Sequence, residues 1–382
     1  MIVIVAPYSP PDRPGNSHLG ASRKIEIIIS MLGKLGQACV LINSAHNTNQ
    51  KRSLIVERTE IAGVEVTEVV PETHNNRSIG KLKNILNCHA TIKKIKQIGT
   101  PSLFWFYNGY SFEMAMALRA KKIFNCPMIL EFEDWHFSRS RGINPKPYLD
   151  FLLWRLAAPK MSASFSVNNL LRNKMARFNN YSYLLPGVVP QRLNQIAKRS
   201  QPFMNTDRLN VGYFGGLSKE KGADIVLELA SLLPDKFNIH VTGSGELSSS
   251  FIEKSKSIKN LNYYGRVDDE ALYSLIEKCD ILLNPHASIK DMGSGIFPFK
   301  VIEAVASGRV LISTPIPSEN LEEVVSSIIF VERSTSAFLA AINSASAFYS
   351  NNYSLIEDTS LLANELFGEA SMLSKVNSLV AG

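Results

Sequence analysis

Residues 297–313 read Phe-Pro-Phe-Lys-Val-Ile-Glu-Ala-Val-Ala-Ser-Gly-Arg-Val-Leu-Ile-Ser, which predicts a short helix followed by a buried strand. Proline suits the first turn of a helix because its missing N–H would have no partner there, and Gly308 suits the position just beyond the last turn. We therefore expect a helix over residues 299–307 and a strand over residues 309–313. The free N–H groups at the start of such a helix can bind phosphate oxygens.

Two charged side chains lie three positions apart in this helix and therefore share one of its faces. Lys300 can neutralise a phosphate as a point charge, and the carboxylate of Glu303 can accept hydrogen bonds from the neighbouring hydroxyls of a ribose. The alternative is a surface pair in which Glu303 is merely solvated. The residues alone favour the two interpretations about equally.

Strand-like and helix-like segments alternate over most of the chain, which predicts an α/β fold with parallel sheets. Besides residues 309–313, the strands expected in the second half are residues 209–214, 237–242 and 280–284, and a helix is expected over residues 270–279. In the first half we expect strands at residues 1–6, 38–43, 103–107 and 128–133, and a helix over residues 22–35.

The length of 382 residues, with 45% hydrophobic residues, predicts two domains that each bury a core. We expect an N-terminal domain over residues 1–195 and a C-terminal domain over residues 205–345. A polar stretch without clear periodicity, residues 191–208, is interpreted as the linker between them. A C-terminal helix over about residues 350–382 is expected to be able to pack back on the first domain.

The segment quoted above resembles the donor-binding helix of retaining GT-B glycosyltransferases, glycosyltransferase family four. One branch of that family carries the pattern Pro-x-Lys-x-x-Glu-x-x-Ala-x-Gly, and the residues that match it are Pro298, Lys300, Glu303, Ala306 and Gly308. The resemblance implies an α/β, GT-B fold with two Rossmann-like, parallel-sheet domains facing each other across a cleft. It also implies that Glu303 holds the nucleotide ribose.

Other segments follow the order of the family over most of the chain. A glycine-rich turn at residues 213–217 precedes Lys221, which by resemblance binds the donor diphosphate. The loop that contains Gly243 resembles the loop near the nucleotide base, and Gly15 and Gly20 belong to a first loop whose glycines let the backbone approach the donor. The predicted donor-binding residues are Gly15, Gly20, Gly216, Lys221, Gly243, Arg266, Gly295, Phe299, Lys300 and Glu303.

The donor site departs from the family pattern at two positions. The family often has an arginine where this chain has Gly216, and many members have a glutamate where it has Gly295. The cations available to replace the arginine are Lys219, Arg266 and Lys300. The groups available to replace the glutamate are the carboxylate of Asp291 and the backbone N–H groups of residues 293–295.

Residues 131–136, Glu-Phe-Glu-Asp-Trp-His, stand where the family has a His-Asp motif. Asp134 matches the aspartate, and Glu133 takes the place of the histidine. Together with His136 they are the predicted catalytic residues, which would orient the acceptor hydroxyl or share its proton. An ordinary polar loop with solvated carboxylates is the alternative. Glu131, Glu133 and Asp134 also resemble an acidic metal motif, but we predict no metal.

Composition limits where the chain acts and what it binds. Its four cysteines are scattered without a C-x-x-C pair, and no signal peptide or membrane span is recognised, so we expect a cytoplasmic protein. The net charge of +7 suits phosphorylated substrates or an anionic membrane surface, while no nucleic-acid-binding motif is present. Lysines among apolar residues at 80–99 predict either an interfacial helix at the inner face of the membrane or a plain surface helix.

The expected function is a metal-independent, retaining, hexosyltransferase-like transfer of a sugar from a UDP- or GDP-linked donor to a glycan or lipid-linked acceptor. By resemblance, this transfer would belong to the synthesis of a bacterial envelope polysaccharide such as lipopolysaccharide. No separate cofactor is expected. Three alternatives remain: a non-catalytic or partner-dependent nucleotide-binding protein with this fold, a GT-B epimerase, and a GT-B phosphorylase. A nicotinamide dehydrogenase is disfavoured because no G-x-G-x-x-G follows the first strand.

Overall fold

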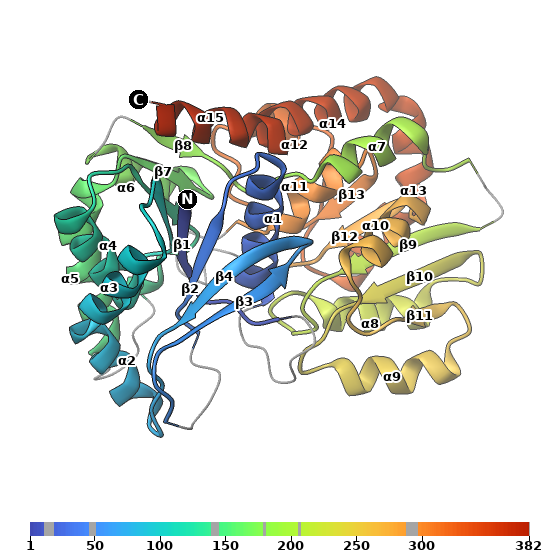
Figure 1. Ribbon diagram of the computed structural model, residues 1–382. Helices are drawn as coiled ribbons and strands as arrows, with labels where there is room; N and C mark the ends of the chain where they lie inside the picture. The colour runs from blue at the N-terminus through green and yellow to red at the C-terminus, as the bar shows by residue number, and fades with distance from the viewer. Residues whose placement is uncertain are drawn as a thin grey trace. The chain divides into compact units, whose positions relative to one another are not determined.

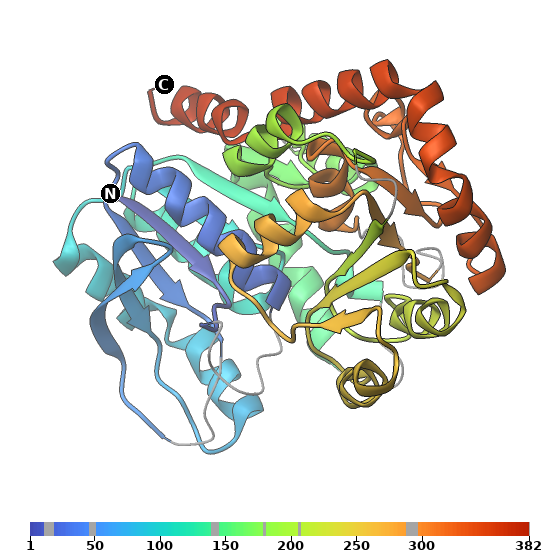
Figure 2. The same ribbon diagram turned by 90° about the vertical axis from the view of Figure 1, so that its right-hand side faces the viewer.

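The computed structural model describes residues 1–10, 19–45, 51–138, 145–178, 181–204, 208–287 and 297–381. It divides the chain into two compact units: the first is Met1–Val188 with Met372–Gly382, and the second is Val189–Ser371. Each unit is built on its own sheet covered by helices (Figure 1 and Figure 2), as the alternation in the sequence predicts.

The first unit contains an eight-stranded sheet in the order β3-β4-β2-β1-β5-β6-β7-β8. Its strands are β1 (Ile2–Ala6), β2 (Cys39–Asn43), β3 (Ile55–Ile61), β4 (Val64–Val70), β5 (Leu103–Tyr107), β6 (Met128–Phe132), β7 (Ala163–Ser166) and β8 (Ser182–Leu184). All neighbouring strands run parallel except β3 and β4, which form an antiparallel hairpin. Strands β1, β2, β5 and β6 are continuously buried and, apart from Asn43 and Glu131, apolar, as is typical of central strands of a parallel sheet.

Helices connect these strands. They are α1 (Leu19–Lys34), α2 (Arg77–Leu86), α3 (Cys88–Ile98), α4 (Ser111–Ile123), α5 (Lys146–Ala157) and α6 (Asn169–Ala176), with short 3₁₀ turns at His136–Ser138 and Ala158–Lys160. Helices α2, α3, α4 and α5 pack side by side along one side of the sheet (Figure 1). The end of α15 (Glu369–Ala381) belongs to this unit, and Nζ of Lys375 lies 6.0 Å from the ring centre of Tyr183.

The second unit contains a six-stranded parallel sheet in the order β11-β10-β9-β12-β13-β14. Its strands are β9 (Leu209–Phe214), β10 (Phe237–Thr242), β11 (Leu261–Tyr263), β12 (Ile281–Asn284), β13 (Val310–Ser313) and β14 (Ile329–Phe330). Its helices are α7 (Gln191–Arg199), α8 (Ala223–Leu232), α9 (Ser248–Ser257), α10 (Asp269–Lys278), α11 (Phe299–Ala306), α12 (Glu322–Val325), α13 (Thr335–Asn351) and α14 (Tyr353–Phe367). Helix α13 packs against β13 and α8, and α14 packs against α11 and α12 (Figure 2).

The stretch expected as an irregular linker forms helix α7. Leu193 and Ile196 lie three positions apart and are both buried, so the helix has a short apolar face that its many polar residues conceal in the sequence. The guanidinium of buried Arg309 then fixes the end of this helix by donating hydrogen bonds to the carbonyl oxygen and hydroxyl of Ser200, both at 2.7 Å. Residues 191–204 are therefore a packed part of the second unit.

Two further expectations in the first half need correction. Residues 80–99 do not form one helix, because the chain breaks at Asn87 between α2 and α3. The hairpin of β3 and β4 was not expected at all. It turns through Ala62 and Gly63, which both have positive φ angles, and its outer strand is largely exposed, so it lacks the buried apolar run that marked the other strands.

Candidate functional site

The second sheet changes direction at β9. The neighbour of β9 on one side is β10, the next strand along the chain, whereas its neighbour on the other side is β12. Ligands of open α/β sheets bind at such a switch point, outside the carboxyl ends of the strands. The loops that follow β9 and β12 therefore meet at the expected place, and the second of them leads to α11.

Tyr213 supports the loop that follows β9. Its ring is completely buried, and its hydroxyl lies 2.9 Å from the carbonyl oxygen of Gly216 and 3.0 Å from that of Lys221. Burial raises the pKa of this phenol, so its hydroxyl keeps the proton it donates. A single buried side chain thus fixes the conformation of the glycine-rich turn and of the lysine after it.

Two lysines flank the glycines of this turn. A Cβ atom on Gly216 would lie 3.0 Å from Nζ of Lys221, and a Cβ atom on Gly215 would lie 4.0 Å from Nζ of Lys300. Nζ of Lys300 also lies 4.4 Å from the ring centre of Tyr213. The structure therefore brings together Gly216, Lys221 and Lys300, three of the residues that the sequence predicts for the donor site.

The ammonium group of Lys300 is in an unfavourable environment. Its Nζ is buried and has no hydrogen-bond partner among the described parts of the chain. Burial, reinforced by the charge of Lys221, lowers its pKa to about 7. Burial likewise lowers the pKa of nearby His286, and the charges of Lys300 and Lys221 act in the same direction. A bound anion would supply both the missing hydrogen-bond acceptor and the compensating charge.

The glycines of this region are required by contacts between loops. Gly243 has a φ angle of +125°, and a Cβ atom on it would lie 1.8 Å from the carbonyl oxygen of Gly215. Gly222, with a φ angle of +78°, would place a Cβ atom 2.0 Å from the carbonyl oxygen of Pro285. The loops after β9, β10 and β12 thus touch backbone to backbone, which only glycine allows. Gly243 holds the turn of Gly215 and Gly216 in place.

Helix α11 begins at Phe299, with Pro298 as the residue before its first turn, and Gly308 has the left-handed φ angle of +68° expected beyond the last turn. Glu303 is only 4% exposed and sits among buried apolar neighbours on this helix. The alternative of a merely solvated Glu303 is therefore excluded. Burying a carboxylate costs free energy, so its presence here calls for a structural or ligand-binding reason.

The carboxylates at the end of β6 surround a lysine in the first unit. Nζ of Lys24, from α1, lies 2.5 Å from Glu131 and also forms an ion pair with Glu133. Although burial opposes its charge, these two carboxylates raise the pKa of Lys24. Nε1 of Trp105 donates a 3.2 Å hydrogen bond to Glu131, which is completely buried, and burial raises the pKa of that carboxyl group. The ammonium group of Lys24 thus occupies the space between the carboxylates of Glu131 and Glu133, which a metal ion bound by both would need.

Of the predicted catalytic residues, Glu133 is 21% exposed and Asp134 is also partly exposed, whereas His136 is nearly buried. Nε2 of His136 lies 3.3 Å from Oδ2 of Asp150, which comes from α5. Burial alone would raise the pKa of Asp150, but hydrogen bonds from His136, Lys146 and Ser111 lower it to about 2. The imidazole therefore lies beside a carboxylate that is ionised at neutral pH.

The remaining predicted residues are distributed as follows. Gly15, Gly295 and the proposed substitutes at 291 and 293–295 lie outside the described residues. Gly20 lies in the first turn of α1, in the first unit, and Arg266 is exposed beyond β11 in the second unit. Phe299 opens α11 and is partly buried. Within the described ranges, no group of three or more His, Cys, Asp or Glu side chains is arranged to hold a metal ion.

Sequence reasoning missed Lys24, Asp150 and His286. A signal for Lys24 was present, because it shares a helical stripe with the buried residues Ile28 and Met31. Asp150 likewise interrupts the apolar run of α5. A charged residue on an otherwise apolar helix face indicates a buried partner, although the pattern does not say which one. His286 has no such signal, because it follows a strand as an ordinary loop residue.

Comparisons with known proteins match this architecture. A family model described as Glycosyl transferases group 1 matches residues 208–347, which lie within the second unit. Sucrose-phosphate synthase from Thermosynechococcus elongatus superimposes with a TM-score of 0.68 at 12% identity, covering 100% of this chain and 99% of that one. The chain has the GT-B fold. A glycosyltransferase from Rickettsia africae gives a TM-score of 0.66 at 14% identity, with coverages of 99% and 97%.

Anabaena HepE in complex with UDP also shares the GT-B fold, with a TM-score of 0.64 at 11% identity and complete coverage of both chains. No curated protein matches the sequence. Identities this low establish the fold and not the substrate. No helix among the described residues is long and apolar enough to cross a membrane.

Proposed function

We propose that this GT-B protein is a retaining glycosyltransferase that moves a sugar from a nucleotide-diphosphate donor to a glycan or lipid-linked acceptor. The observation that carries the proposal is the pair of ammonium groups of Lys221 and Lys300 beside the Gly215–Gly216 turn. They lie at the switch point of a sheet within the segment that matches the glycosyltransferase model. Nζ of Lys300 is buried without a hydrogen-bond partner among the described residues, as expected of a cation that binds an anionic ligand.

The roles of these residues follow from the charge that develops during transfer. The bond between the sugar and the diphosphate breaks, so negative charge grows on the leaving diphosphate, and preorganised cations stabilise it. Lys221 and Lys300 supply two cations, and the N–H groups at the start of α11 add their dipoles. Glu303 holds the ribose. By the family resemblance the donor is UDP- or GDP-linked, and neither a resident metal nor a separate cofactor is needed in this scheme.

The acceptor would be handled by the first unit. Glu133 and Asp134 are the partly exposed carboxylates able to contact an acceptor hydroxyl, and His136 is oriented by Asp150. Lys24 fixes the rotamer of Glu133 through their ion pair. We propose a cytoplasmic reaction, at or near the inner face of the membrane, that contributes to an envelope polysaccharide. This part of the proposal rests on the family resemblance.

The test combines binding and transfer. The melting temperature of the native protein is measured with UDP, GDP and their sugars, because a ligand that binds only the folded state raises it. Sugar transfer and release are then assayed with the nucleotide that binds. Glu303→Ala should lose roughly 10- to 100-fold in donor affinity, the loss expected for hydrogen bonds to a charged group. Glu253→Ala, an exposed glutamate on α9, is the matched control.

Near-normal turnover of the Glu303→Ala protein would refute the ribose role. Stabilisation by a nucleotide without any release or transfer of sugar would instead favour the non-catalytic alternative. Failure of every nucleotide to raise the melting temperature would overturn the donor site itself.

A further inference from the structure

On the outer helices of the first unit, basic residues greatly outnumber acidic ones. Helices α2, α3, α4 and α5 contain eleven lysines and arginines against two acidic residues, Glu113 and Asp150. Both acidic residues are buried. The excess of nine positive charges in these four helices is larger than the net charge of +7 of the whole chain. This face therefore presents positive charge with no exposed acidic residue on the helices that form it.

Large apolar side chains are exposed on the same helices. In α2, the residues Ile79, Leu82 and Leu86 follow helical spacing along one face, and Leu86 is 65% exposed. In α5, the residues Tyr148, Leu152 and Leu156 do the same, and Leu152 is 55% exposed. Single exposed leucines are ordinary, but here two rows of large apolar side chains lie on helices that both pack against α4. Exposed apolar surface that gathers in this way marks interaction sites on soluble proteins.

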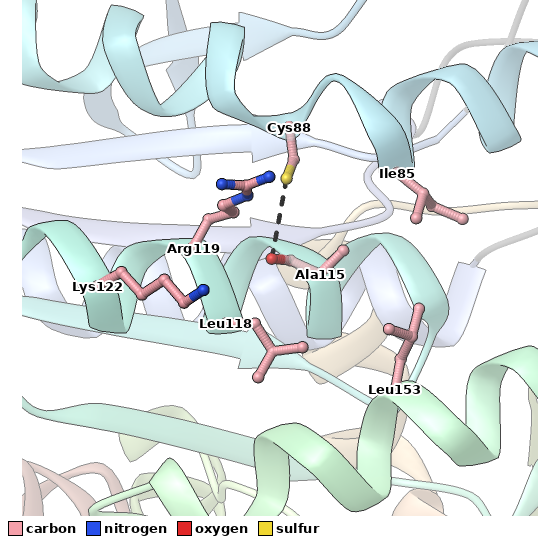
Figure 3. A pocket seen from close by; sticks show the side chains of 7 residues that line it. All are labelled: Ile85, Cys88, Ala115, Leu118, Arg119, Lys122 and Leu153. Carbon is pink, nitrogen blue, oxygen red and sulfur yellow. Dashed lines mark hydrogen bonds between the residues drawn. The ribbon is translucent and has the colours of Figure 1, made fainter.

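A pocket of about 250 Å³ lies between these rows. Figure 3 shows it over α4, with Ile85 and Cys88 on one side and Leu153 on the other. Leu118 completes its apolar wall. Arg119 and Lys122, which also come from α4, add two cations to the lining. An apolar pocket with two adjacent cations suits an amphiphile that carries an anionic group. Its volume is below the range usual for a drug-sized ligand.

We propose that the outer face of α2, α3, α4 and α5 docks on an anionic lipid bilayer. Arg119 and Lys122 bind a lipid phosphate at the pocket, and the leucines of α2 and α5 enter the apolar layer beside it. Interfacial helices bind membranes through this combination of apolar area and basic charge. A nucleic acid would use the cations but would leave the two apolar rows in water. Because a lipid bilayer would bury the two apolar rows and a nucleic acid would not, we favour the bilayer as the partner.

The inference extends the proposed function, because a lipid-linked acceptor would be reached from a membrane surface. It is tested without any sugar donor, so its failure would leave the donor site untouched. The full chain is sedimented with vesicles of phosphatidylcholine alone and of phosphatidylcholine mixed with phosphatidylglycerol. We expect the native protein to bind the mixed vesicles and not the neutral ones.

Two double variants separate the charged from the apolar contribution. Arg119→Ala/Lys122→Ala should lower the partition coefficient on mixed vesicles roughly 30-fold, from the usual contribution of two basic residues near an anionic surface. Leu86→Gln/Leu152→Gln should lower it at least about tenfold by removing apolar area. All four side chains are at least partly exposed on helices, so the variants should fold, and unchanged melting temperatures will verify this. Lys256→Ala/Lys259→Ala and Leu232→Gln, at exposed positions of the second unit, are the matched controls.

The proposal is overturned if the native protein fails to bind mixed vesicles, or if either double variant binds them as well as the controls do. It is also overturned if the surface binds an RNA oligomer with an affinity that depends on Arg119 and Lys122 but not on the leucines.

Discussion

The buried ammonium group of Lys300 lowers the stability of the folded chain. An ammonium group without a hydrogen-bond partner among the described residues, beside a second lysine, is less stable in the folded chain than in the unfolded one. We predict that Lys300→Met raises the free energy of unfolding of the ligand-free protein by about 1–2 kcal/mol at pH 7. The same change should weaken nucleotide-diphosphate binding about 10- to 100-fold, since a charged hydrogen bond is lost.

Thermal unfolding with and without UDP measures both effects. Lys256→Met, at an exposed site on α9, should change neither quantity. A Lys300→Met protein that is less stable than the native one, yet binds UDP normally, would contradict the role given to this lysine.

The lowered pKa of Lys300 also predicts a pH dependence of binding. In the free protein the group loses its proton above about pH 7, whereas a bound diphosphate would hold the proton in place. Affinity should therefore fall as pH rises, by up to about tenfold between pH 7.5 and 8.5. Titration calorimetry in two buffers of different ionisation enthalpy should detect the uptake of close to one proton at pH 8.

Arginine remains protonated throughout this range, so Lys300→Arg should remove the pH dependence and the proton uptake. If that variant keeps the same pH profile, another group is responsible.

At the residue scale, the sequence predicts the cations better than their surroundings. Lys221 and Lys300 were predicted because each stands at a fixed position in a turn or helix motif. What makes Lys300 unusual is its burial over Tyr213 and the proximity of Lys221, which comes from another loop. The ion pairs of Lys24 with two glutamates 107 and 109 positions away in the chain depend in the same way on the folded sheet.

At the scale of elements, the proposed donor site depends on loops that fit together through glycine. Gly243 combines a φ angle of +125° with a Cβ position 1.8 Å from the carbonyl oxygen of Gly215. Gly243→Ala should therefore destabilise the second unit by about 3 kcal/mol or more, because a steric clash with backbone adds to conformational strain. It should also weaken UDP binding, because the turn that carries Lys221 must move. Denaturant unfolding and UDP titration measure the two effects.

Gly265 is the matched control for this prediction. Its φ angle of +68° is left-handed, but a Cβ atom on it would meet nothing within 4 Å. Gly265→Ala should cost only the conformational strain, about 1–2 kcal/mol, and should leave UDP binding unchanged. Equal losses for the two variants would mean that the contact between the loops is unimportant.

Elements with strong local signals were predicted to within a few residues. In strands β9 and β10 every second residue, starting from Leu209 and Phe237, is apolar, and α11 carries its own start and stop residues, so local chemistry defines their bounds. Helix α7 and the β3–β4 hairpin were missed, because their apolar faces are narrow and become evident only when the surface that they cover is known. The break at Asn87 was missed for a related reason, since lysines alternate with apolar residues in a similar way before and after it.

At the scale of the whole molecule, the two units should respond in opposite ways to mild acid. In the first unit, burial raises the pKa of Glu113 to about 7. Its folded form therefore takes up a proton between pH 7 and the unfolded pKa of about 4.5, and the unit gains stability as pH falls through that range. In the second unit, burial lowers the pKa of His240 to about 4, against 6.5 for the unfolded chain.

Burial disfavours the protonated imidazole of His240, and the charge of Lys278 acts in the same direction. In the neutral ring, Nε2 donates to Oδ1 of Asn210 at 3.0 Å and Nδ1 accepts from the hydroxyl of Tyr264 at 2.8 Å. Between pH 6.5 and 4 the unfolded chain binds the proton and the folded one does not, so the second unit loses stability as pH falls. From pH 7.5 to 5 each of the two shifts corresponds to about 2 kcal/mol, with opposite signs.

Hydrogen exchange measured by mass spectrometry at pH 7.5 and 5, corrected for intrinsic exchange rates, can separate the two units. We predict that protection of β10 decreases relative to that of β5 at the lower pH, because global opening of the second unit becomes easier while that of the first becomes harder. His240→Asn should reduce the loss in β10 and leave β5 unchanged, with the remainder due to His286, whose pKa burial also lowers. Glu113→Gln should reduce the gain in β5 and leave β10 unchanged, with the remainder due to Glu131, whose pKa burial also raises. Parallel loss of protection in both units would show that other groups control acid stability, and that burial of these two side chains does not set it.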